Sequence, residues 1–145
     1  MVRNLFVAAL IAATAGLAEL NVPLYAQAPQ SAAAARNSNL ANIRASIVWK
    51  IGAGDQTIEV TSTDKILTVL RVNSHMNQST HTDRNNEAMA IGETVAGAIE
   101  GRSEFKSLIV IRVEYVSRPV GGKARIIDTV DFRKDPKGIF QFHQT

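Results

Sequence analysis

The sequence predicts an α+β domain in which one helix packs on one face of an antiparallel sheet of about six strands. Two observations support this prediction. Short apolar segments with alternating polar positions are separated by turn residues, and one longer segment has helical spacing. The expected order is β-β-β-α-β-β-β, which suits a two-layer fold. The chain has 145 residues, enough for one modest core.

Residues 1–28 have the features of a secretory signal peptide. A basic start at Arg3 precedes an apolar run over residues 5–18, and the segment ends in the small-x-small pattern AQA at Ala28. The apolar run is shorter than the roughly 20 residues needed to cross a bilayer. We therefore expect export to a bacterial periplasm or the cell exterior, with no stable membrane span after cleavage.

Composition excludes several functional classes. The chain has no cysteine, which rules out a disulfide scaffold, thiol catalysis and thiolate metal sites. A net charge of +3 is mild, and we expect no nucleic-acid partner. No motif for a cofactor is present, so none is expected.

Residues 29–39 are small and polar and predict a flexible leader, which leaves residues 40–145 as a single α+β domain. Alternating apolar positions predict a first strand over residues 43–51. After the turn signal GAGD, two further strands are expected near residues 58–62 and 66–72.

Helical spacing of apolar residues predicts a helix over residues 84–101, with Thr82 or Asp83 as its N-cap. Gly92 and Gly97 each weaken a helix by about 1 kcal/mol relative to alanine. They would, however, let the helix approach the sheet closely.

The last third predicts two hairpins. Strands at residues 107–117 and 124–132 match apolar to apolar if Ile111 opposes Val130. The DPKG turn then leads to a last strand over residues 139–144. A bulge at Gly138 places Phe142 opposite Phe132.

Three histidines form one candidate metal site. His75 and His81 lie six residues apart in a polar loop, and His143 is the third imidazole. The spacing fits neither a rigid metal turn nor a helical pair, so the alternative is a solvated connector between strand and helix.

Carboxylates on the penultimate strand form the candidate catalytic groups. The predicted register sets His143 opposite Asp131, which is half of a general-base arrangement, but no strained nucleophile accompanies the pair. The alternative is an exposed cross-strand charge pair. Asp128 falls on the core face, where an unpaired acid is costly. Either a pocket opens there, with Asp128 and Tyr115 as its polar groups, or the register slips locally.

The function that these observations favour is a small, exported, non-catalytic binding or interaction module. The candidate binding residues are Arg112, Glu114, Asp131 and Tyr115. A protein partner or a second copy would bind the outer sheet face or the edge of the last strand. The alternatives are a small-ligand pocket or enzyme that uses Asp128, and a periplasmic metal-binding protein that uses the three histidines.

Overall fold

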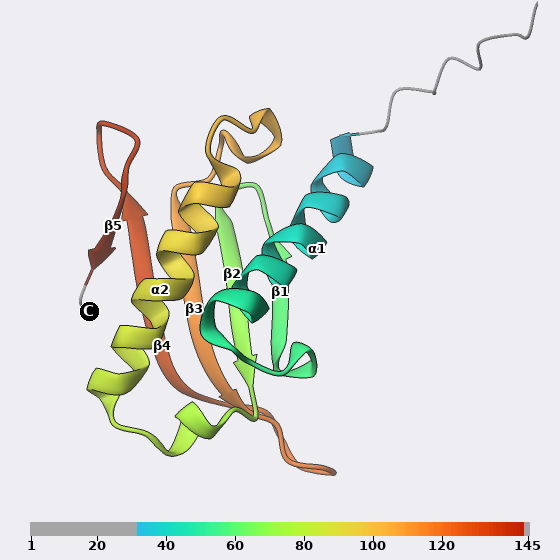
Figure 1. Ribbon diagram of the computed structural model, residues 1–145, viewed down its shortest axis with the longest axis vertical. Helices are drawn as coiled ribbons and strands as arrows, with labels where there is room; N and C mark the ends of the chain where they lie inside the picture. Colours follow the sequence, from blue (N-terminus) through green and yellow to red (C-terminus); the bar gives the residue numbers. More distant parts are fainter. Residues whose placement is uncertain (1–31, 144–145) are drawn as a thin grey trace, which may run out of the picture.

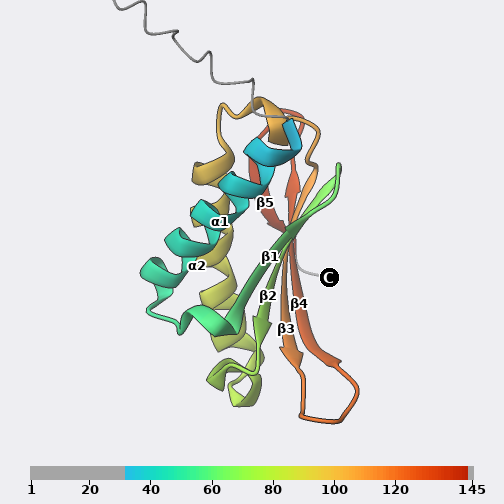
Figure 2. The ribbon, with the colours of Figure 1, turned by 90° about the vertical axis from the view of Figure 1, so that its right-hand side faces the viewer.

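The computed structural model describes residues 32–143, which form a five-stranded mixed sheet with two helices on one face (Figures 1 and 2). The α+β class is confirmed, while the numbers of strands and helices differ from the prediction. The helices are α1 (Ala32–Ile51) and α2 (His81–Ile99). The strands are β1 (Ile58–Ser62), β2 (Ile66–Val72), β3 (Val110–Ser117), β4 (Arg125–Lys134) and β5 (Phe140–His143). Short 3-10 turns are η1 (Asp55–Thr57), η2 (His75–Gln78) and η3 (Ser103–Phe105).

The sheet is mixed because α2 connects β2 to its neighbour β3. The strand order is β1-β2-β3-β4-β5, and β2 pairs with β3 in parallel while the other pairs are antiparallel. A helical crossover returns the chain to the end of the sheet where the previous strand began, and this produces a parallel neighbour. The prediction of a wholly antiparallel sheet is therefore wrong at β2–β3.

The predicted first strand is the second half of α1. Ile43 and Ile47 are buried while Trp49 is 85 % exposed, so burial follows helical spacing and not the alternation of residues 43–51. An alanine-rich segment precedes these residues and favours a helix. The helix also begins at Ala32, so the segment predicted to be a flexible leader is helical from that residue onward.

Helix α2 begins with a capping box at Thr80, two or three residues before the predicted N-cap. The Thr80 hydroxyl accepts from the Asp83 N–H, and the Asp83 carboxylate accepts from the Thr80 N–H. Gly92 does allow close approach to the sheet, because a Cβ there would lie 2.7 Å from the Phe132 ring. Gly97 has no such role, since nothing lies within 4 Å of its Cβ position.

The first C-terminal hairpin is shifted by two residues from its predicted register. Ile111 pairs with Phe132, not with Val130, so between this pair and the pair of Tyr115 with Asp128 the side chains keep their predicted face but not their partner. An irregularity between Tyr115 and Val116 then shifts the pairing by one residue.

The second hairpin is confirmed. Phe132 pairs with Phe142, with ring centroids 5.9 Å apart, and Asp131 pairs with His143. Gly138 has a φ of 87°, the left-handed conformation that the predicted bulge requires.

The core lies between the helices and the sheet. It includes Ile43 and Ile47 from α1, Ile91 and Val95 from α2, and alternate residues of the three central strands. Within the described part of the chain, no helix has the length and apolar character needed to cross a membrane. The predicted signal peptide, residues 1–28, lies outside the described residues.

Candidate functional site

A polar network joins the start of α2 to β4. His81 and Arg84 lie one turn apart on α2, and both reach Asp128. The Asp128 Oδ2 atom is 2.7 Å from His81 Nδ1 and 2.7 Å from Arg84 Nε. The other oxygen accepts from the Thr129 backbone N–H at 2.9 Å. The core-facing acid of the sequence is therefore paired and hydrogen-bonded, and the register irregularity lies beside its partner, Tyr115.

His81 is oriented by a carboxylate, as a general base would be, but its outer nitrogen is occupied. Its Nε2 atom lies 3.1 Å from the Asn85 amide nitrogen. These partners favour a proton on Nδ1 that is donated to Asp128, with Nε2 accepting from Asn85. Among the described residues, no hydrogen bond connects His81 to a hydroxyl group. The arrangement therefore orients an imidazole but supplies no nucleophile for it.

Asp128 has the electrostatics of an ion-pair partner. Burial alone would raise the pKa of this carboxyl. The hydrogen bonds from Arg84, His81 and Thr129 outweigh burial and hold the pKa below its ordinary value. A general acid would need the opposite shift. Neither of the two cavities described below includes Asp128 in its lining.

A second buried ion pair lies beside the first. Arg71, only 1 % exposed, donates to both carboxylate oxygens of Glu87 at 2.8 and 3.1 Å and to the Thr57 hydroxyl at 2.7 Å. Tyr115 is fully buried, and its hydroxyl donates to the Arg84 carbonyl at 2.8 Å. Burial, reinforced by the charge of Glu87, raises the pKa of Tyr115 far above its ordinary value. These residues attach α2 to the sheet, and Tyr115 does not reach the surface.

The outer sheet face carries the remaining predicted binding residues. Arg112 donates to both oxygens of Asp131 at 2.8 and 2.9 Å. These hydrogen bonds lower the pKa of Asp131, against the effect of burial. His143 is opposite Asp131 in the sheet register, but the acid forms its hydrogen bonds with Arg112. Glu114 lies on the same face, opposite Thr129.

The three histidines lie in separate elements. His75 is in η2, His81 begins α2 and His143 ends β5. In the described residues there is no group of three or more histidine or acidic side chains that could hold a metal ion.

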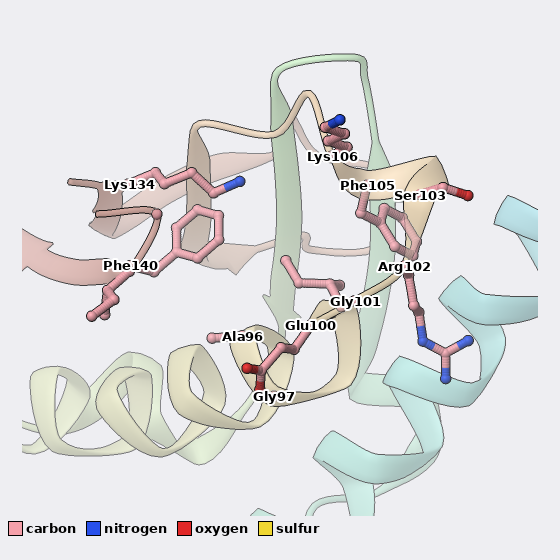
Figure 3. Close-up of a pocket in the computed structure, with 13 residues that line it drawn as sticks. Ala96, Gly97, Glu100, Gly101, Arg102, Ser103, Phe105, Lys106, Lys134 and Phe140 are labelled. Atoms are coloured by element: carbon pink, nitrogen blue, oxygen red, sulfur yellow. The ribbon is translucent and has the colours of Figure 1, made fainter. Parts of the chain in front are cut away.

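A cavity of about 580 Å³ lies where the C-terminal end of α2 meets η3 and the β4–β5 hairpin (Figure 3). Its lining includes apolar groups from all three segments. These are Ala96, Ile99, Phe105, Ile139 and Phe140. The volume is within the range of about 300–1,000 Å³ that is usual for small-molecule sites.

The charged residues of this lining are three cations and one carboxylate: Arg102, Lys106, Lys134 and Glu100. Arg102 turns toward α1 and donates to the Asn39 side chain of that helix (Figure 3). It also donates to the Ala98 carbonyl of α2. The Lys134 ammonium lies 5.2 Å from the centre of the Phe140 ring. Within the described residues, neither Lys106 nor Lys134 is within ion-pair distance of a carboxylate.

The sequence gives no sign of this cavity. Its three segments are separated along the chain, and each one alone is an ordinary helix end or turn. Only the β4–β5 register, together with the position of α2 over Phe132, would have placed Phe140 beside Ala96.

Comparison with known proteins gives no match: no family model fits the chain, and no similar curated protein or solved structure is found.

Proposed function

We propose that the chain is an exported, non-catalytic binding module, and that it holds a small amphiphilic anion in the cavity at the C-terminal end of α2. The observation that carries the proposal is the presence, in one cavity lining, of apolar side chains and of two lysines that form no ion pair with a described acid. The signal-like features of residues 1–28 support a periplasmic or extracellular location.

The lining favours an anionic head group over a cationic one. The lining contains two lysines without acidic partners, Lys106 and Lys134, and one carboxylate, Glu100. Arg102 offsets the negative end of α2 by donating to the Ala98 carbonyl. A head group near Lys106 and Lys134 would form charge-assisted hydrogen bonds. An acyl or aromatic body would then lie against Phe105 and Phe140, where burial of its apolar surface is favourable.

The test compares three probes that share a ten-carbon tail and differ in the charge of the head: decanoate, decanol and decyltrimethylammonium. Binding is measured by isothermal titration calorimetry below the micellar concentrations. We expect decanoate to bind most tightly. Equal binding of all three, or preference for the cation, would contradict the proposal.

Variants locate the binding. Lys134→Gln and Lys106→Gln should each weaken decanoate binding by at least about tenfold, because a charge-assisted hydrogen bond contributes about 1.5–3 kcal/mol. Decanol binding should not change. The matched control is Lys123→Gln, in the exposed β3–β4 loop, which should leave all three affinities unchanged.

A partner surface on the opposite face of the sheet is the second candidate. Both helices lie on one face, and no described element covers the other, which carries Arg112, Glu114 and Asp131 (Figure 2). A photo-crosslinking amino acid in place of Glu114 should then crosslink the protein to one partner, as a single product, in the cells that produce it. The same residue at Lys123 is the control, and equal adducts at both positions would refute this candidate.

A further inference from the structure

A shallow apolar groove runs between α1 and α2. Its volume is about 600 Å³. Both helices contribute to it, α1 with four residues and α2 with two: Ala45, Ser46, Trp49, Lys50, Glu93 and Thr94. The groove is formed by the two helices alone, and these lie side by side on the same face of the sheet (Figures 1 and 2).

Trp49 is the most unusual residue of this groove. It is the only tryptophan of the chain, and 85 % of it is exposed. Ile43 and Ile47 fix the core-facing side of α1, so the fold itself does not use the indole ring. Exposed tryptophan side chains are enriched among residues that dominate protein interfaces.

Beside the indole, the groove is lined by small side chains. Ala45 lies one turn before Trp49 on α1, and Ser46 and Thr94 continue this lining. On α2, the exposed Met89 lies one turn before Glu93. The same face therefore carries both a projecting aromatic group and a hollow into which such a group can fit.

The charges of the groove are self-complementary. Lys50 lies on the α1 wall and Glu93 on the α2 wall, and neither forms an ion pair with another described residue. A two-fold axis across the groove would place Lys50 of each copy against Glu93 of the other. In a contact with two-fold symmetry each residue pair occurs twice, so the two pairs of Lys50 with Glu93 form together.

We propose that this face binds a second copy of the same chain, with Trp49 of each copy seated in the groove of the other. A helix rises about 1.5 Å per residue, so each helix is close to 30 Å long. Two adjacent helices about 10 Å wide then present an area of the same order as the roughly 800 Å² per partner of standard interfaces. A membrane surface is disfavoured, because the groove pairs one acid with one base and lacks a cluster of basic residues.

The dimer has a direct spectroscopic signal, since Trp49 is the only tryptophan. The protein is produced from the full chain, its N-terminus is read by mass spectrometry, and its mass in solution is measured by sedimentation equilibrium. We expect a monomer–dimer equilibrium, and an emission maximum that moves to shorter wavelength as the dimer forms. A monomer at all concentrations, or a dimer without this spectral shift, would overturn the proposal. So would a shift caused by lipid vesicles at concentrations where the protein is monomeric.

Charge reversal supplies the decisive control. Lys50→Glu and Glu93→Lys should each weaken self-association by at least about tenfold, because each creates two like-charge contacts across the two-fold axis. A mixture of the two variants should dimerise again, since one copy then carries two acids at these positions and the other carries two bases. Restored pairing also shows that both variants are folded. Variants that still dimerise alone, or a mixture that stays monomeric, would refute the arrangement.

Discussion

Alanine at Gly92 should destabilise the fold, although alanine is normally the better helix residue. A Cβ at this position would lie 2.7 Å from two carbons of the Phe132 ring. Carbon atoms are at their optimum separation at about 3.5–4.0 Å, so the ring must move by about 1 Å. The ring is only 4 % exposed and packs beside Phe142, so it has little room to move.

The change in the free energy of unfolding on Gly92→Ala is the sum of two opposing effects. Overpacking a core costs about 1–3 kcal/mol, whereas replacing a helical glycine by alanine contributes about 1 kcal/mol of stability. Gly97→Ala is the matched control on the same helix, since its Cβ would contact nothing within 4 Å. We therefore expect the free energy of unfolding of Gly92→Ala to lie about 1–3 kcal/mol below that of Gly97→Ala.

Urea unfolding followed by circular dichroism measures both free energies. Equal stabilisation of the two alanine variants would contradict a clash between position 92 and the Phe132 ring. A double variant, Gly92→Ala with Phe132→Leu, separates the clash from any other effect. Its destabilisation should be smaller than the sum of the two single values, because a shorter side chain removes the overlap.

Two further predictions concern the ion pairs. Asp128 and Asp131 both have a pKa below the ordinary value of 3.8, so their ionised forms stabilise the fold. The stabilisation by each ionised carboxylate is complete above pH 3.8 and is lost as the pH falls through the pKa of the folded state. When the free energy of unfolding is measured during acid titration, Asp131→Asn should therefore lose less stability than the native chain. Glu87→Gln should cost about 3–5 kcal/mol in urea unfolding, because it leaves Arg71 buried without its anion. The double variant with Arg71→Met should recover part of that loss, and no recovery would contradict the assignment.

Local turn chemistry explains what the sequence predicted well. The β4–β5 register depends on Asp135, which accepts from the Lys137 and Ile139 N–H groups, and on Gly138. These residues lie within five positions of one another, so the pairing of Phe132 with Phe142 could be predicted without knowing the rest of the fold.

Alternation alone could not decide between strand and helix in residues 43–51. Ile43, Ile47 and Ile51 fit a helical stripe as well as one face of a strand, and the preceding alanines resolve the choice. The partner of Asp128 was also beyond local reasoning, because His81 lies 47 residues away. The helix that brings them together was predicted, but its position over the sheet depends on tertiary packing at Gly92.

The parallel pairing of β2 with β3 has a consequence for the order of folding. The other strand pairs of the described sheet are joined by short turns, whereas Leu67 and Ile111, which pair in the sheet, are 44 residues apart. Closing this loop costs about 1 kcal/mol more than closing a ten-residue hairpin, since each doubling of length adds about 0.6 kcal/mol. The N-terminal and C-terminal hairpins can thus form first and independently. Their union needs the longer loop that contains α2, so we expect this pairing to form after the two hairpins.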